Sequence, residues 1–403
     1  MRIPIVILIG LVLASSLAAQ TRPRGRDLGI PFPGKTGPNN AITDVAGIAV
    51  GHVTLIEGEG KLIPGKGPIR TGVTAILPRP NGNWDPVFAA TFNLNGNGDM
   101  TGINWIKESG FMEGPILLTG THSVGTVRDA AIQWQLKNGR KFIFTYPIVA
   151  ETFDFLNDAN GEHVKPMHAL QALDNAKTGL VQEGAVGGGT GMGCNGFKGG
   201  IGTSSRVLEQ GGYTIGVLVQ CNYGGDLRIL GVPVRQEITD LRACTTLPQP
   251  LTREWTRGMP ACTSDRGAND TPEEQQYEGR GSIIVIVATD APLLPHQLER
   301  LTRRVGMGLG RLGSWAGNSS GDLFLAFSTA NAGAGSPEGT PSLKMLPNDQ
   351  IDPLFRATID ATEEAVVNAM LAADTMTGAD GIRLFGLPGD RVVAALKKYN
   401  RMK

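Results

Sequence analysis

The sequence predicts an α/β fold in which two β-sheets are covered by helices. Several strands are expected to be continuous apolar runs, as at 282–290 and 322–328, and such runs are typical of strands buried on both faces. The helical segments are apolar on one face only, and between 294 and 312 leucines and a valine recur at spacings of three and four. A half-exposed sandwich would instead alternate apolar and polar residues along its strands.

The first half of the chain alternates between the two kinds of segment. Apolar β-branched residues predict strands at 44–55, 71–77, 87–94, 141–145 and, after a break, 147–150. One-sided apolar patterns predict helices at 123–136 and 163–180. The Asn-Gly-rich turn at 95–99 is expected to cap a further helix that starts near Met100. A Gly-rich block follows at 184–202.

The second half contains the clearest elements. Strands are predicted at 213–221, 282–290 and 322–328, and helices at 294–312, 361–373 and 391–399, the last with Asp390 as its N-cap. Residues 239–281 contain four prolines and few apolar runs, so they are expected to form a poorly ordered linker that is accessible to cleavage.

Residues 1–19 have the pattern of a secretory signal, with a basic start, a short apolar core and small residues before Gln20. The apolar run is short for a membrane span. We therefore expect an exported, periplasmic or secreted protein, and an uncleaved anchor is the alternative. The mature chain is long enough for one large domain or two medium ones.

The composition argues against several classes of function. Lysine plus arginine and aspartate plus glutamate both number 37, so the net charge is zero and nucleic-acid binding has no electrostatic support. The five histidines form no metal-binding pair, and no metal or cofactor is expected. Of the four cysteines, Cys194 and Cys221 are expected to be packed thiols. Cys244 and Cys262 flank the Pro-rich loop, where a disulfide and free thiols are equally compatible with the sequence.

The junction of Gly281 and Ser282 is the most informative point of the chain. It joins the polar linker to an apolar strand, so a serine begins a core strand directly after a segment that is easy to cut. Cleavage before Ser282 would give that serine a free α-amine, with an unperturbed pKa of about 7.7–8.0, beside its hydroxyl. One residue would then hold both a nucleophile and a base. A plain strand start is the alternative.

Two familiar motifs do not carry a function here. Gly191-x-Gly193-x-x-Gly196 is not followed by a helix start, so a dinucleotide site is not supported. The segment 317–321 matches the G-x-S-x-G nucleophile elbow around Ser319. That reading needs a histidine later in the chain, and the last one is His296.

Four other residues are candidates for supporting roles. Ser320 and Asp322 are two apart at a strand start, so both can project to one face, or they form only a turn. Asn222 ends a strand and could donate to an oxyanion, or it could make an Asx turn. Glu151 follows an apolar run, so it is expected to be partly buried. A buried carboxylate needs a cationic partner, which could be an arginine of the fold or a substrate ammonium.

Five segments together resemble the DmpA-type aminopeptidases, which include L-aminopeptidase/D-Ala-esterase/amidases and β-peptidyl aminopeptidases. The segments are 40–52, 120–129, 187–192, 281–295 and 318–331. The resemblance implies a four-layer α-β-β-α sandwich similar to N-terminal-nucleophile hydrolases, with different connectivity. The related ornithine acetyltransferases cut before threonine, so Ser282 and the signal argue against that family.

The resemblance also implies the roles of the candidate residues. Residues 20–281 would form an α chain, with 239–281 as the processing linker, and residues 282–403 a β chain of the same domain. Ser282 would be the nucleophile, supported by Ser320 and Asp322. Asn222 would be the oxyanion donor, and Glu151 would bind the free amine of the substrate. Family members often have a tyrosine near that glutamate, whereas this chain has Phe153.

We therefore expect an exported, self-processing serine aminopeptidase or amidase. Its substrates would be small peptides, amides or esters with a free amine, and D- or β-residues are among the candidates. The resemblance suggests a tetramer of processed αβ protomers. The alternative is an exported, uncut binding protein that holds a ligand with its Gly-rich loops.

Overall fold

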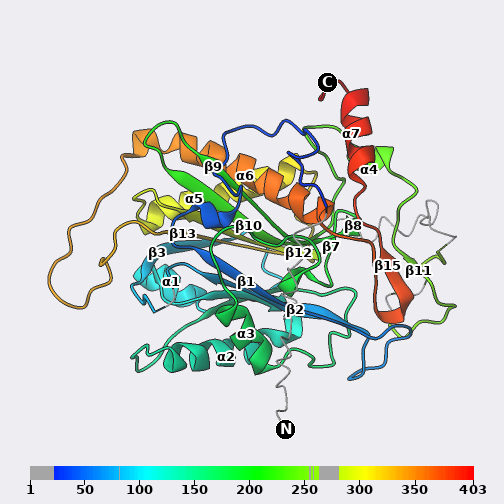
Figure 1. Cartoon of the computed structure of the whole chain (residues 1–403), viewed down its shortest axis with the longest axis horizontal. Coiled ribbons are helices and arrows are strands. Elements are labelled where there is room, and N and C mark those ends of the chain that lie inside the picture. The colour runs from blue at the N-terminus through cyan, green and yellow to red at the C-terminus, as the bar shows by residue number, and fades with distance from the viewer. Residues whose placement is uncertain (1–21, 81, 254–255, 257, 263–280) are drawn as a thin grey trace, which may run out of the picture.

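Two β-sheets lie face to face at the centre of the molecule, and helices cover both outer faces (Figure 1). The structure is a computed structural model of the 403-residue chain, and it describes residues 22–80, 82–253, 256, 258–262 and 281–403. The predicted signal at 1–19 and most of the linker beyond Cys262 lie outside the described residues. The four layers agree with the predicted α-β-β-α sandwich.

The larger sheet has six strands in the order β4-β3-β13-β12-β10-β9. Strand β12 lies at its centre, parallel to β13 and antiparallel to β10. The strand bounds are Val87–Asn93 (β3), Phe111–Met112 (β4), Gly200–Val207 (β9), Thr214–Tyr223 (β10), Gly281–Thr289 (β12) and Gly321–Ser328 (β13).

The smaller central sheet has four strands in the order β1-β2-β5-β6, and short strands form two further sheets. The strand bounds of this four-stranded sheet are Ala49–Glu57 (β1), Ile69–Leu77 (β2), Ile116–Gly120 (β5) and Ile148–Thr152 (β6). The remaining strands are Gly193–Cys194 (β7), Phe197–Lys198 (β8), Cys244–Thr245 (β11), Met376–Thr377 (β14) and Ile382–Leu384 (β15).

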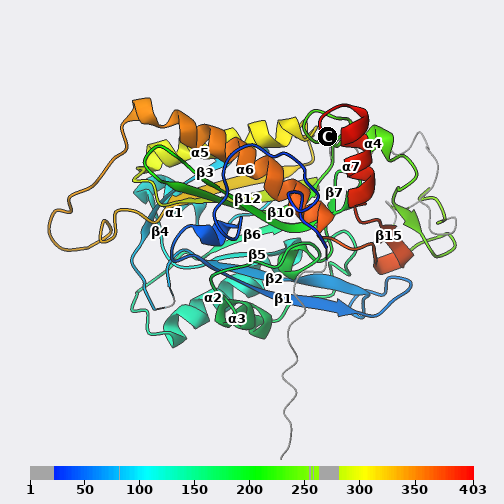
Figure 2. The ribbon, with the colours of Figure 1, turned by 45° about the horizontal axis from the view of Figure 1, so that its top comes forward.

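Helices α5 and α6 cover the six-stranded sheet, and α2 and α3 cover the four-stranded sheet, as the turned view in Figure 2 also shows. The helix bounds are Ile103–Ser109 (α1), Val124–Lys137 (α2), Pro166–Asp174 (α3), Val234–Glu237 (α4), Pro295–Arg311 (α5), Asp352–Leu371 (α6) and Gly389–Lys398 (α7). In the described chain, no helix is long and apolar enough to cross a bilayer.

The side-chain alternation of β12 explains why the layers hold together. Ile283, Val285 and Val287 belong to the apolar core on the helix side of the sheet. Ile284 and Ile286 belong to the core between the two sheets. A strand whose two faces both pack in this way must be apolar throughout, which is the pattern that predicted it.

Several predicted elements need correction. Residues 141–145 are not a strand; Ile143 is 99 % exposed, so this apolar run lies on the surface. Residues 44–48 precede β1 and are not part of it. Strands β5 and β9 were not predicted. Strand β9 lies partly inside the Gly-rich block, where glycine hides the strand pattern. Helix α3 is shorter than predicted and α6 is longer.

The two predicted helix caps are also wrong. The cap residue of α1 is Gly102, which has no side chain to accept a hydrogen bond, and the turn at 95–99 instead contacts strand β6. The cap position of α7 is Pro388, and Asp390 lies in the first turn. A carboxylate there still interacts favourably with the helix dipole.

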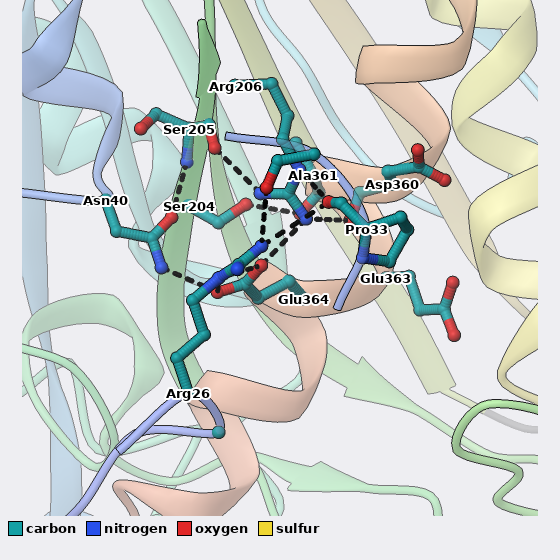
Figure 3. A network of polar contacts seen from close by, with 12 residues as sticks. Arg26, Pro33, Asn40, Ser204, Ser205, Arg206, Asp360, Ala361, Glu363 and Glu364 are labelled. Carbon is teal, nitrogen blue, oxygen red and sulfur yellow. Dashed lines mark hydrogen bonds and ion pairs between the residues drawn. The ribbon is translucent and has the colours of Figure 1, made fainter. Parts of the chain in front are cut away.

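Helix α6 is anchored to β9 by a buried polar network, drawn in Figure 3. Arg206 donates to Glu364 at 2.7 Å, and both side chains are almost fully buried. Asn40 Nδ2 donates to Glu364 at 2.6 Å, and the side-chain Oδ1 of Asn40 accepts from the Ser205 N–H. Arg26 completes the set with a bond from Nε to Glu364. Each buried charge in this network therefore has an opposite charge as its partner.

Both pairs of cysteines form disulfides in the structure. Cys244 and Cys262 are joined across a separation of 18 residues, in agreement with one of the two predicted alternatives. Cys194 and Cys221 are also joined, with Cα atoms 5.8 Å apart, so the prediction of packed free thiols is wrong. The fold explains the error, because the antiparallel pair of β7 and β8 lies against the end of β10 and brings Cys194 next to a cysteine 27 residues further along the chain.

Candidate active site

Ser282 lies at the beginning of β12 and is paired with residues of both neighbouring strands. On one side its Cα partner is Asn222, at the end of β10. On the other side its partner is Gly321, at the beginning of β13. The start of β12 therefore brings together three segments that are far apart in the sequence. Ser282 is 6 % exposed, so its hydroxyl is held at a nearly dry strand end.

The hydroxyl of Ser282 contacts the peptide bond that precedes it. Its Oγ donates to the Gly281 carbonyl oxygen at 2.7 Å and accepts from the Gly321 N–H at 3.2 Å. Gly281 has a φ of +125°, a region that favours glycine. A Cβ at this position would lie 2.1 Å from the Asn222 carbonyl oxygen. The junction therefore requires glycine, for reasons of both conformation and space.

Asn222 is held at both ends of its amide. Its Nδ2 donates to the Phe153 carbonyl oxygen at 2.9 Å, and its Oδ1 accepts from the Gly193 N–H at 2.9 Å. These two contacts identify Nδ2 as the donor end and Oδ1 as the acceptor end of the Asn222 amide. An amide nitrogen carries two hydrogens, so one N–H of Asn222 remains to serve an oxyanion. Phe153 takes part through its backbone, which needs no phenol.

Ser320 and Asp322 contact each other directly. Ser320 Oγ donates to Asp322 Oδ1 at 2.7 Å, and Asn95 Nδ2 donates to Asp322 Oδ2 at 3.3 Å. Burial raises the pKa of the Asp322 carboxyl, while the hydrogen bonds from Ser320 and Asn95 act in the opposite direction. Among the described residues, the hydrogen-bond partners of Ser282 Oγ are the backbone groups of Gly281 and Gly321. The support that the family resemblance implies for Ser282 from Ser320 and Asp322 stays a prediction.

Glu151 is a buried carboxylate at the end of β6, and it is 3 % exposed. The Asp99 N–H donates to its Oε1 at 2.9 Å, and the Thr121 hydroxyl donates to its Oε2. Burial raises the pKa of Glu151, and these two hydrogen bonds oppose the rise. No arginine or lysine of the described chain lies within ion-pair distance of it. A carboxylate in this position is suited to receive a cation from outside.

Glu151 also lies close to the beginning of β13, the strand whose Gly321 N–H donates to Ser282. A Cβ built on Gly98 would be 3.2 Å from Glu151 Oε1 and 3.5 Å from the Gly321 Cα. Gly321 in turn donates to Ser282. The structure therefore brings all five predicted side chains into one region, at the beginning of β12 and β13. The described residues hold no cluster of three or more metal-ligating side chains.

The residues that hold these side chains were not predicted from the sequence. Asn95, Asp99, Thr121 and Gly193 each contact a predicted site residue. Two of these contacts are made by backbone N–H groups, which carry no sequence signal. The other two come from ordinary polar residues next to glycines. The Asn-Gly turn at 95–99 was itself recognisable, but its partner across the sheets was not.

Comparison with known proteins identifies the family of this chain. The model of peptidase family S58 matches residues 40–384, which is most of the chain and includes every site residue described above. The chain belongs to peptidase family S58. It is thus a hydrolase of the aminopeptidase type, as the curated relatives also indicate.

Two curated relatives of this S58 chain come from one bacterial genus. The beta-peptidyl aminopeptidase BapA of Sphingosinicella microcystinivorans is 50% identical, and the alignment covers 98% of this chain and 97% of the relative. The protein of the same name from Sphingosinicella xenopeptidilytica is 44% identical, over 97% and 94% of the two chains.

Solved structures of S58-like proteins share the fold. The L-aminopeptidase D-Ala-esterase/amidase of Ochrobactrum anthropi, described as a variant of the Ntn hydrolase fold, superposes with a TM-score of 0.82 at 42% identity. The match covers 95% of this chain and 100% of that one. A beta-aminopeptidase from a Burkholderia species gives a TM-score of 0.78 at 44% identity, over 93% and 99%. The predicted fold class is confirmed.

Proposed function

We propose that this S58 chain is an exported serine aminopeptidase that activates itself by cutting the bond between Gly281 and Ser282. The observation that carries the proposal is the pairing of Ser282 with Asn222 at adjacent strand ends. A nucleophile and an oxyanion donor must lie side by side to act on one carbonyl, and this pairing supplies that geometry.

The proposed cleavage starts from the contact between Ser282 Oγ and the Gly281 carbonyl. Attack of Oγ on the carbonyl carbon forms an ester and releases the Ser282 nitrogen, which takes up the hydroxyl proton. Water then hydrolyses the ester, so the carboxylate of Gly281 and the free amine of Ser282 are the products. The hydroxyl is 2.7 Å from the carbonyl oxygen. Gly281 supports this step because it has no Cβ and takes a backbone conformation next to the attacked carbonyl that other residues rarely adopt.

The proposed turnover uses the same serine. The α-amine of Ser282 takes the proton as Oγ attacks the substrate carbonyl, and the N–H of Asn222 stabilises the oxyanion. The amine then returns the proton to the leaving group, and water releases the acyl product by the reverse steps. The Ser320–Asp322 pair would hold the new amino terminus in place through hydrogen bonds.

Glu151 would restrict the enzyme to substrates with a free amino terminus. A substrate ammonium would find a buried carboxylate that is already aligned by Thr121 and Asp99. A blocked amine would leave the carboxylate unpaired and dry, which is unfavourable. The names of the Sphingosinicella and Burkholderia proteins favour β-amino acid residues as the group removed.

Export and assembly complete the proposal. The signal-like residues 1–19 and the two disulfides both suit an oxidising compartment, so we place the enzyme in the periplasm or outside the cell. We propose that two chains, 20–281 and 282–403, stay together and assemble into a tetramer. Partial proteolysis of this kind leaves a large shared core intact, since β12 and β10 lie in one sheet.

Matched substrates test the proposed activity. β-Alanyl, L-alanyl and D-alanyl p-nitroanilides and their N-acetylated forms are incubated with the wild type and with Ser282→Ala. We expect turnover of at least one free-amine substrate, none of its acetylated form, and none with the variant. Hydrolysis of acetylated substrates would contradict the amine anchor. Binding without turnover of any substrate would favour the alternative of a binding protein with Gly-rich loops.

A further inference from the structure

Lys198 is a buried lysine next to the active site that the mechanism above does not use. Its side chain is fully buried in β8, inside the Gly-rich block at 184–202. Its Nζ donates to three backbone carbonyls, those of Gly199 at 2.7 Å, Met192 at 2.8 Å and Gly189 at 3.3 Å. No carboxylate of the described chain lies within ion-pair distance of it.

This environment differs from that of Arg206, the other cation among the largest fully buried side chains of the described residues. Arg206 in β9 is paired with Glu364, as Figure 3 shows, and that pair joins a helix to a strand. Among the described residues, the partners of the Lys198 side chain are backbone carbonyls of the Gly-rich block. Burial without a counter-charge lowers the pKa of Lys198 to about 7. Both the ammonium and the neutral amine have at least two N–H groups for the two short contacts.

The carbonyls that Lys198 binds belong to the loop that orients Asn222. Met192 is followed directly by Gly193, whose N–H donates to Asn222 Oδ1. The next residue, Cys194, is bonded to Cys221, which precedes Asn222. Gly193 is therefore held on one side by the lysine and on the other by a covalent bond. Backbone bonds also hold the loop, among them those from the Leu156 N–H to Gly191 and from the Gly199 N–H to Met192, and the Lys198 side chain adds a link between the carbonyls of Gly189, Met192 and Gly199.

We propose that Lys198 is a positioning residue for Asn222: it fixes the Gly-rich loop so that the Gly193 N–H holds the Asn222 amide with one N–H aimed at the oxyanion. The inference rests on the proposed role of Asn222 in the aminopeptidase. The effect should appear in the transition state, because the substrate carbonyl bears its negative charge only there. Binding of the free amine by Glu151 should change little.

A double-mutant cycle tests this coupling in the processed enzyme. Lys198→Met keeps most of the volume and removes the donors, and we expect kcat to fall by about tenfold or more with KM changed by less than about twofold. In the Asn222→Ala background the same substitution should lower kcat by less than about twofold, because the group it positions is gone. Lys198→Gln, which keeps a shorter donor, should recover part of the loss.

Asn40→Gly serves as the matched structural control. It removes two hydrogen bonds from the network around Arg206 and suits the φ of +46° at this position. Ser205 pairs with Gly216, six residues along β10 from Asn222, so the site is about 20 Å away. We expect a lower Tm with unchanged kcat.

The outcomes separate the two proposals. Equal losses of kcat on adding Lys198→Met to the wild type and to Asn222→Ala would overturn the role of Lys198, and so would a loss no larger than that of a control with the same Tm. Crystal structures of the wild type and of Lys198→Met give a readout that needs no activity. We expect the 2.9 Å contact between Gly193 N and Asn222 Oδ1 to be lost in the variant. An unchanged contact would refute the inference, whereas an inactive wild type would refute the proposed function alone.

Discussion

Asn222 and Ser282 are direct partners across the antiparallel pair formed by β10 and β12. Directly opposite residues of an antiparallel pair project to the same face of the sheet. The amide and the hydroxyl are thus held side by side by the backbone ladder, without any flexible loop between them. The same ladder continues into a core of β-branched residues, so stability and site geometry depend on the same strands.

The carboxylate of Glu151 gives the first prediction. Glu151→Gln keeps the shape and removes the charge that would pair with a substrate ammonium. A charge-assisted hydrogen bond in a partly dry site contributes roughly 1.5–3 kcal/mol, so kcat/KM for free-amine substrates should fall by about tenfold to a hundredfold. Self-cleavage should continue, because the precursor offers no free amine there. An equal loss of both activities would identify Glu151 as a structural residue.

The pH dependence of substrate binding gives a second prediction. Burial raises the pKa of Glu151, so its carboxylate takes up a proton at a higher pH than an ordinary glutamate does. As the pH falls through that raised value, the anchor becomes neutral and KM for free-amine substrates should rise. The folded state also binds this proton more tightly than the unfolded state does. Glu151 therefore lowers the stability of the fold as the pH rises from the ordinary pKa of a glutamate to the raised pKa of Glu151. Glu151→Gln should flatten the acid limb of KM; an unchanged limb would assign it to another group.

The bond between Ser320 and Asp322 gives the third prediction. Asp322→Asn keeps the size and removes the charge that accepts from Ser320 Oγ. If the pair supports the reacting serine, the variant should fold and lose most of its kcat, with a smaller change in KM. If the segment is only a turn before β13, Tm should fall while turnover per folded molecule stays near normal. Tm and turnover are measured on the same preparation.

The backbone of Gly281 gives the fourth prediction. Gly281→Ala would place a Cβ 2.1 Å from the Asn222 carbonyl oxygen at a φ of +125°. The junction must then move, and we expect the rate of self-cleavage to fall by about tenfold or more, since a displacement of about 1 Å can cost a hundredfold. Gly310→Ala is the control, because a Cβ there meets nothing within 4 Å. It should process normally; equal rates for both variants would show that the glycine is not needed.

The sequence predicted the fold where hydrophobic periodicity was strong. Strand β12 and helix α5 agree with the predicted bounds to within a few residues, because one is apolar throughout and the other repeats at three and four. Strand β9 was missed because its glycines pack against α6, so that a Cβ on Gly202 would lie 2.0 Å from the Ala365 carbonyl oxygen. Close backbone packing of this kind removes the side chains on which pattern recognition depends.

The site shows the same division. Ser282, Asn222, Ser320, Asp322 and Glu151 were named from the sequence because each stands where a strand begins or ends. Their mutual positions depend on strand order, and no local pattern gives the parallel pairing of β12 with β13. The disulfide between Cys194 and Cys221 was missed because the two cysteines lie in different sheets, which meet only in the folded chain. Lys198 lacked any signal, because a lysine in a Gly-rich segment is usually a solvated one.

Self-cleavage before Ser282 can be measured from the intact mass of the purified wild type under denaturing conditions, with N-terminal sequencing of each species. We expect two species after removal of the signal, of which the smaller begins at Ser282, and a single uncut species for Ser282→Ala produced in the same way. A wild type that remains one chain while it hydrolyses free-amine substrates would refute activation by self-cleavage, as would a Ser282→Ala variant that yields the same two species.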